Sequence, residues 1–80
     1  MTVEQIIEQV QDIFREVLDN DSISVNHDST AEHIDEWDSL THIQLVMGIE
    51  QHFDIRFKSS EIVAFKNVGE MCEGIKLKIG

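Results

Sequence analysis

Apolar residues recur at steps of three and four along four stretches of the chain, the spacing that places them on one face of an α-helix. The stretches are residues 2–19, 39–52 and 61–64, and a last one that follows Asn67. This pattern predicts an all-α fold, a small bundle of three longer helices and one short helix with a long first loop. Eighty residues suffice for one such domain, residues 1–80.

Polar residues that favour helix N-termini precede each stretch. They are Thr2 with Gln5, Asp38 with Ser39, Ser59 or Ser60, and Asn67 with Glu70. Residues 20–36 are rich in Asp, Ser, Asn and His, and they form a connection long enough that we expect it to be anchored. Its expected anchors are Ile23, Val25, Ile34 and Trp37. Trp37 could instead stand exposed as a contact for a partner.

The second stretch displays a serine where its apolar stripe begins. The residues expected to face inward are Leu40, Ile43, Val46, Met47, Ile49 and Phe53, with Glu50 in the same register. Ser39 is expected beside backbone N–H groups that have no partner within the helix. Partial positive charge collects there and favours an anion such as a phosphodiester. The pattern therefore indicates a modifiable serine at a phosphate-friendly helix end, although a simple N-cap would use the same residue.

Charge is distributed unevenly along the chain, which has 16 acidic and 6 basic residues and a formal net charge of −10. Residues 1–55 hold 13 acids against Arg15 alone, a charge of −12, whereas residues 56–80 carry +2. So negative a surface argues against nucleic acid and anionic membranes as partners. It suits partner proteins with basic patches, or it serves solubility alone.

The remaining candidate chemistry is sparse. Cys72 is the only cysteine, so no disulfide framework is expected. No signal peptide or transmembrane run is recognisable, and we expect a cytoplasmic monomer that does not insert into membranes. No metal site is expected, because the histidines lack ligand spacing and residues 19–30 lack the glycine and glutamate of a calcium loop.

His42 follows Ser39 by three residues and could suggest a nucleophilic pair. The segment lacks the G-x-S-x-G pattern of hydrolases, however. We therefore expect a solvated surface histidine and no catalytic residue. Gly48, in the middle of the same predicted helix, indicates either close helix packing or room for a guest chain.

Residues 35–55 resemble the acyl carrier protein family. The match consists of Asp38-Ser39-Leu40, the helix from Ile43 to Ile49, and then Glu50, Phe53, Asp54 and Ile55. The family also has the long first loop, and residues 67–71 are similar to the segment that opens its last helix. The resemblance implies a carrier rather than an enzyme, with a covalent 4'-phosphopantetheine arm on Ser39.

Further roles follow from that resemblance. A phosphopantetheinyl transferase, using Mg²⁺ in its own site, would attach the arm, and enzymes with basic docking patches would load and use the acyl group. The acyl thioester would serve fatty-acid, lipid or specialised acyl metabolism. Asp38 would contribute to transferase docking and Leu40 would anchor the serine turn to the core. The residues expected to line an acyl-holding core are Val46, Met47, Ile49, Phe53, Ile62 and Ile75.

The chain also departs from the family, whose second helix is usually acidic on its exposed face. The positions expected to be exposed here are uncharged or weakly basic, namely Thr41, His42, Gln44, Gln51 and His52. Acidic residues precede the serine instead, at Asp35, Glu36 and Asp38. This departure suggests a carrier for a dedicated pathway. Two alternatives remain, an aminoacyl or peptidyl carrier of a small non-ribosomal pathway and an unmodified acidic helical docking domain.

Overall fold

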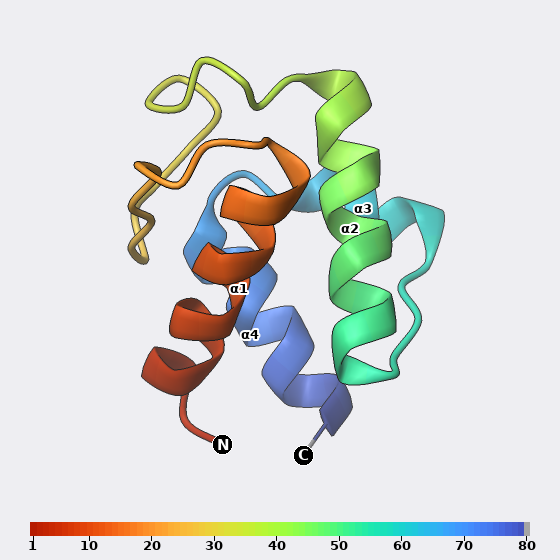
Figure 1. Ribbon diagram of the computed structural model, residues 1–80. Helices are drawn as coiled ribbons and strands as arrows, with labels where there is room; N and C mark the ends of the chain where they lie inside the picture. The colour runs from red at the N-terminus through yellow and green to blue at the C-terminus, as the bar shows by residue number, and fades with distance from the viewer. Residues whose placement is uncertain (80) are drawn as a thin grey trace.

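Four α-helices make up most of the computed structural model, which describes residues 1–79 (Figure 1). They are α1 (Val3–Val17), α2 (Ser39–Phe53), α3 (Ser59–Ala64) and α4 (Val68–Ile79). The described residues contain no strand. The expectation of an all-α bundle with three longer helices, one short helix and a long first loop is confirmed.

The core forms where α1 packs against both α2 and α4. In Figure 1, α1 rises from the N-terminus and α2 and α4 run back toward the same end. The fully buried side chains of the core cluster are Ile6, Val10, Phe14, Leu45, Ile49, Val68, Met71, Cys72 and Ile75. Each large apolar side chain buried in this way contributes roughly 1.5–3 kcal/mol. Four of the buried residues belong to α4, so the apolar face predicted for the stretch after Asn67 is confirmed.

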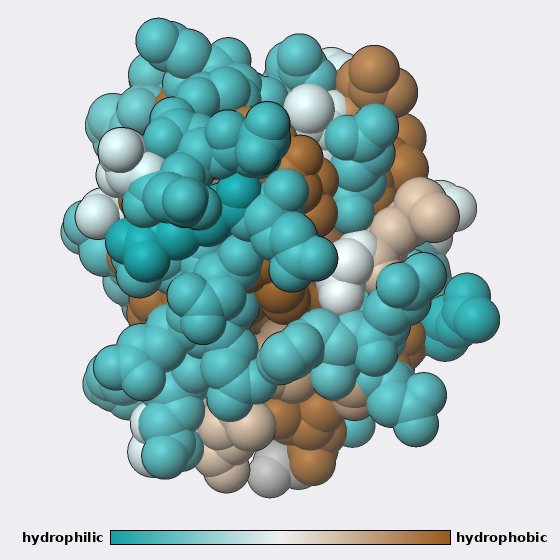
Figure 2. All heavy atoms as spheres, viewed as in Figure 1, coloured by the Kyte–Doolittle hydropathy of each residue, from teal (hydrophilic) through white to brown (hydrophobic). Residues whose placement is uncertain are grey.

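The inward face of α2 differs from the predicted one. Leu45, Val46 and Ile49 are buried, whereas Leu40, Ile43 and Met47 are 68%, 54% and 53% exposed. Apolar residues surround much of this helix, so spacing alone does not single out one face. Contact with α1 selects the buried face, and hydrophobic atoms remain visible along the outer edge of the first turns of α2 (Figure 2).

The small residue in the middle of α2 serves helix packing. A Cβ atom built at Gly48 would lie 3.1 Å from Ile13 Cγ2 and 3.6 Å from Val17 Cγ2. Both residues belong to α1, so a side chain at position 48 would press the two helices apart. Of the two interpretations of Gly48, close packing is the one that this geometry supports.

The long loop is anchored by the residues expected to anchor it. Ile23, Val25, Ile34 and Trp37 are each less than one-tenth exposed. The Trp37 ring meets the Phe14 ring edge-on, with centroids 5.0 Å apart. The alternative of an exposed Trp37 is wrong, because this contact places the indole in the core.

Polar contacts tie the first half of the loop to α1. Arg15 Nε donates to the Ile23 carbonyl at 2.7 Å. The Val25 N–H donates to Gln11 Oε1 at 3.0 Å. Side chains of α1 thus satisfy backbone groups of the loop, which otherwise lacks regular hydrogen bonding.

The second half of the loop closes the start of α4. The N–H groups of Val68 and Gly69 donate to the carbonyls of Ser29 and His27 at 2.9 and 2.8 Å. Asn67 Oδ1 accepts the N–H of Glu70 at 2.8 Å, which confirms Asn67 as the cap. The loop therefore supplies acceptors for the unpaired N–H groups of the first turn of α4.

Two other helix starts have defined caps. Thr2 and Gln5 form the predicted capping box, with bonds of 3.2 and 2.8 Å. α3 begins differently from the prediction, because its N-cap is Lys58 rather than Ser59 or Ser60. Glu61 Oε1 accepts the Lys58 N–H at 2.8 Å, and the helix starts at Ser59, two residues before the predicted stretch 61–64.

Candidate functional site

Ser39 is the first residue of α2, and its side chain is exposed. The long loop runs directly into it through Trp37 and Asp38. Because Trp37 is buried and α2 is packed on α1, the serine is held on a fixed backbone between two anchored elements. This geometry leaves Ser39 exposed at the point where loop and helix meet.

A reciprocal cap fixes the turn around the serine. Asp38 Oδ1 accepts the N–H groups of Leu40 and Thr41, both at 2.9 Å. Thr41 Oγ1 accepts the Asp38 N–H at 2.7 Å and donates to the Glu36 carbonyl at 2.8 Å. The N–H of Thr41, followed by that of Leu40, lowers the pKa of the Asp38 carboxyl below its ordinary value of 3.8.

This cap reduces the number of free donors at the helix start, where the sequence indicated a phosphate-friendly end. Two of the first-turn N–H groups are already bonded to the Asp38 carboxylate. The carboxylate also offsets the partial positive charge of the helix N-terminus, which weakens the attraction of that end for a second anion. A phosphodiester at Ser39 would therefore find few free backbone donors, and its counter-charge has to come from another element.

A shallow groove between α2 and α3 begins at Ser39 and is lined mainly by apolar and aromatic side chains. The lining residues are Ala31, Trp37, Asp38, Ser39, His42, Ile43, Ile62, Val63, Phe65 and Lys66. Lys66 is the cation of this set, and it follows α3 in the chain. The groove thus combines a displayed hydroxyl, apolar walls and one positive charge.

His42 occupies an unexpected position, because the prediction of a solvated surface histidine is wrong. The indole N–H of Trp37 donates to His42 Nδ1 at 3.1 Å, and His42 Nε2 lies 2.8 Å from the Ile62 carbonyl oxygen. The ring is half-buried between the loop and α3. The Ile62 partner is 20 residues away, so no local pattern could have revealed it.

The residues expected to line an acyl-holding core are not gathered around one cavity. Val46, Ile49 and Ile75 are almost completely buried, and Met47 is 53% exposed. Of the six, only Ile62 lines the groove beside Ser39, while Met47 borders a separate surface groove between α1 and α2. Leu40, expected as an anchor of the serine turn, is 68% exposed, because its position on α2 faces away from α1.

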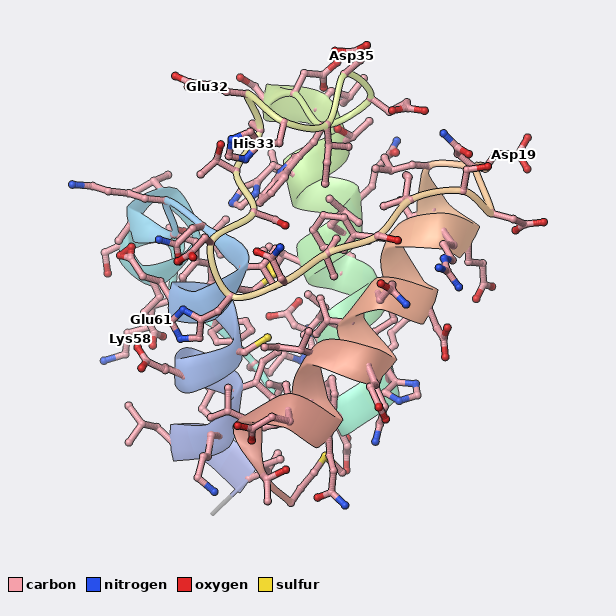
Figure 3. All side chains as sticks on the ribbon, turned by 90° about the vertical axis from the view of Figure 1, so that its left-hand side faces the viewer. Asp19, Glu32, His33, Asp35, Lys58 and Glu61 are labelled. Atoms are coloured by element: carbon pink, nitrogen blue, oxygen red, sulfur yellow. The ribbon has the colours of Figure 1, made fainter. Side chains whose placement is uncertain are left out.

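Acidic side chains lie on the loop that leads into Ser39. Glu32 and Asp35 extend outward from the loop above the start of α2 (Figure 3). The Glu36 carboxylate is tied down instead, since it accepts a 2.7 Å bond from Asn20 Nδ2 that lowers its pKa. These charges stand before the serine, as the sequence indicated, and Thr41, expected to be exposed, is half-buried in the cap.

The described residues show no group of three His, Cys, Asp or Glu side chains placed to hold a metal ion. Among the same residues, no helix combines the length and apolar character needed to cross a bilayer.

The comparisons with known proteins agree with this geometry. Residues 8–75 match the family described as the phosphopantetheine attachment site. The chain is 32% identical to an acyl carrier protein of Prochlorococcus marinus (strain MIT 9515), and the match covers all of both chains. It also resembles the solution NMR structure of holo acyl carrier protein from Geobacter metallireducens, with a TM-score of 0.86 and 36% identity over 92% of this chain and 85% of that one.

The family consists of carriers rather than enzymes, and its cofactor is covalently attached 4'-phosphopantetheine. Its members interact in general with a phosphopantetheinyl transferase and with acyl-handling enzymes. The match covers most of the sequence, the fold agrees, and the serine-bearing turn falls within the matched residues. The chain therefore belongs to the acyl carrier protein family.

Proposed function

We propose that Ser39 carries the 4'-phosphopantetheine arm and that the chain shuttles acyl groups as thioesters between separate enzymes. The observation that carries this proposal is the exposed Ser39 hydroxyl at the start of α2, on the rim of the apolar groove. Serines elsewhere lack this setting. Ser29, for example, is buried and its Oγ accepts the N–H of Asn26.

The groove residues fit an arm of this kind. Ser39 Oγ would hold the phosphodiester, which adds negative charge beside the Asp38 carboxylate. Lys66 is the groove residue whose positive charge could balance it. Ile43 and Val63 would border the pantetheine chain with apolar surface. When bound, the arm supplies a terminal thiol that holds the acyl group as a reactive thioester.

The test is intact mass before and after incubation with coenzyme A and a broad-specificity phosphopantetheinyl transferase. We expect the wild-type chain and Ser60→Ala to gain one phosphopantetheine and Ser39→Ala to gain none. Ser60 is the matched control because it is also exposed on the first turn of a helix. No gain by the wild type with several transferases would leave an unmodified acidic docking domain.

We further propose that the carrier serves a dedicated acyl pathway whose enzymes approach with basic patches. Acidic residues cluster at the loop before Ser39, as Glu32 and Asp35 show, whereas Gln44 and Gln51 on the exposed face of α2 are uncharged. Partner enzymes would therefore contact the acidic loop more than the exposed face of α2. Equal support of core fatty-acid elongation by this carrier and a housekeeping carrier would contradict the proposal.

The cargo we propose is acyl, as the names of the similar proteins suggest. An aminoacyl or peptidyl cargo would be revealed by preferential loading from an aminoacyl-adenylating enzyme. We also propose that residues 1–80 act as one domain, because side chains from α1, α2 and α4 share one core, and that the protein is a monomer. Light scattering of the holo protein measures the mass of the species in solution.

A further inference from the structure

Three groups from three segments form a continuous hydrogen-bonded chain beside Ser39. Trp37 lies at the end of the long loop, His42 on α2 and the Ile62 carbonyl on α3. The bonds are 3.1 Å from Trp37 Nε1 to His42 Nδ1 and 2.8 Å from His42 Nε2 to the Ile62 oxygen. The Trp37 and His42 rings are also stacked, with planes 18° apart and centroids 5.9 Å apart.

The donors and acceptors fix the state of the histidine. An indole N–H only donates, so His42 Nδ1 must accept and the neutral ring carries its hydrogen on Nε2. That hydrogen is then donated to Ile62, whose carbonyl is among the last four of α3 and has no acceptor role within the helix. Both ring nitrogens of His42 are thus used to join α3 to the loop.

α3 has few other ties to the bundle within the described residues. It is six residues long and buries none of its side chains. Glu61 pairs with Lys78 of α4 at 3.2 Å, and the flanking Phe57 and Phe65 rings meet edge-on. Among residues 1–79, the bond from His42 is therefore the side-chain hydrogen bond that holds α3 against α2.

The groove beside Ser39 ends at this hydrogen-bonded chain. Trp37, His42 and Ile62 are all lining residues, whereas fully buried core residues such as Leu45 and Ile49 are not. An acyl chain that entered the space between α2 and α3 from the groove would have to break both hydrogen bonds. It would also have to move the indole from its contact with Phe14. Buried polar groups left unpaired in this way are costly.

We infer that Trp37, His42 and the Ile62 carbonyl form a lock that keeps the space between α2 and α3 closed, so that the acyl group of this carrier stays outside in the groove. The inference rests on the proposed attachment of the arm at Ser39. A solvent-exposed acyl group is disfavoured in proportion to its apolar surface. The lock therefore selects short or polar acyl groups as cargo and makes His42 a specificity-determining residue.

The test compares octanoyl and acetyl thioesters on the holo protein, with attachment to Ser39 established first by mass. Cleavage by hydroxylamine reports how far the thioester is enclosed. On the wild type, we expect both groups to be cleaved as fast as the corresponding acyl-pantetheines, within about twofold. In His42→Ala, the loss of two hydrogen bonds should shift the equilibrium toward the open space between α2 and α3 by about tenfold. The octanoyl thioester should then be cleaved more slowly, whereas the rate of acetyl cleavage should stay unchanged.

His52→Ala is the matched control, because His52 is also on α2 but bonds Gln9 of α1, away from the groove. It should behave as the wild type. A wild-type octanoyl group cleaved severalfold more slowly than octanoyl-pantetheine would overturn the inference and leave the attachment at Ser39 intact.

A second measurement needs no variant and so avoids any loss of folding. The chain has one tryptophan, so its indole N–H gives a single NMR signal. We expect that signal to stay in place when the acetylated holo protein is compared with the octanoylated one. A large displacement on octanoylation would show that the lock opens for long chains and would overturn the inference.

Discussion

Asp38 and Thr41 bond each other in both directions across the first turn of α2. The Asp38 carboxylate accepts the Thr41 N–H at 2.9 Å, and the Thr41 hydroxyl oxygen accepts the Asp38 N–H at 2.7 Å. The same hydroxyl donates to the Glu36 carbonyl, so the cap also reaches back into the loop. Ser39 lies inside this closed turn, so its exposed position depends on Asp38 and Thr41.

Replacing Thr41 by alanine removes the side-chain half of this cap. Two side-chain bonds are lost, and we expect the free energy of unfolding to fall by about 1 kcal/mol. Urea denaturation of the unmodified protein measures the change. Gln44→Ala, on the exposed face one turn later, is the control and should stay within about 0.5 kcal/mol of the wild type. Equal losses in the two variants would contradict the structural role of Thr41.

The same cap makes stability depend on acid pH. The pKa of Asp38 is lowered in the folded protein, chiefly by the Thr41 N–H, so the unfolded chain binds a proton more readily. The stability that the ionised Asp38 carboxylate contributes is fully present above its ordinary pKa of 3.8. It is lost as the pH falls through the lower pKa of the folded protein. Asp38→Asn should therefore be less stable than the wild type at neutral pH, with a difference that shrinks below pH 3.8.

Melting temperatures of the two proteins between neutral and acid pH test this prediction. Asp12→Asn, which changes an exposed carboxylate on α1, serves as the control for charge alone. A difference between Asp38→Asn and the wild type that stays constant over the whole range would show that ionisation of Asp38 does not contribute.

The sequence predicted the helices and the loop anchors because their signals are local. Val68 and Met71 repeat at helical spacing, and Thr2 with Gln5 forms a recognisable cap. Apolar spacing did not identify the buried face of α2, because apolar residues such as Leu40 and Met47 surround much of this helix. Contact with α1 decides which of its sides is buried.

The place of Ser39 at the start of α2 was predictable from local sequence, whereas the position of His42 was not. Its partner Ile62 belongs to another helix, and the bond forms only after α3 has folded back. Capping by Asp38 was expected, but the return bond from the Asp38 N–H to Thr41 Oγ1 and the contact of that hydroxyl with the Glu36 carbonyl were not. Contacts between residues far apart in the sequence can be identified only from the structure.

Gly69 should tolerate a side chain poorly despite lying in a helix. A Cβ atom there would lie 2.6 Å from the His27 backbone oxygen and would also clash with the His27 ring. Alanine gains about 1 kcal/mol of helix propensity, but displacing the loop backbone costs roughly 1–3 kcal/mol. We therefore expect Gly69→Ala to lower the unfolding free energy, as measured in urea.

Gly74→Ala is the comparison for Gly69→Ala. A Cβ atom at Gly74 would meet only the side chains of Phe65 and Phe57, at 3.3 Å or more, and these can shift. It should cost clearly less than Gly69→Ala. If the two variants were equally stable, the close approach of the loop to α4 would not be important for folding.

The excess of acidic residues should make the protein more stable in salt. The 13 acids of residues 1–55 include Glu4, Glu8, Asp12 and Glu16, spaced by four along the exposed side of α1. Salt at 0.1 M screens repulsion beyond about 10 Å, so it weakens the repulsion among the more distant acids, and we expect the melting temperature to rise by a few degrees. Glu8→Gln should show a smaller rise, and a melting temperature indifferent to salt would show that repulsion is negligible.

Cys72 should remain unreactive in the folded protein, which makes thiol counting a direct assay for the arm. Its side chain is fully buried on α4, and burial, together with the neighbouring Glu73, raises its pKa to about 12. Thiolate is the reactive form, so at pH 8 neither exposure nor ionisation favours reaction with Ellman's reagent. We expect no reactive thiol in the folded apo protein and one in denaturant.

With the arm on Ser39, the same assay should give one thiol in the folded protein and two in denaturant. Cys72→Ala with the arm attached separates the two sources, because it should give one thiol under both conditions. Rapid reaction of the folded apo protein would show that α4 opens readily around Cys72. Such opening would conflict with the complete burial of Met71 and Ile75 beside it, and hydrogen exchange of α4 would then locate the motion.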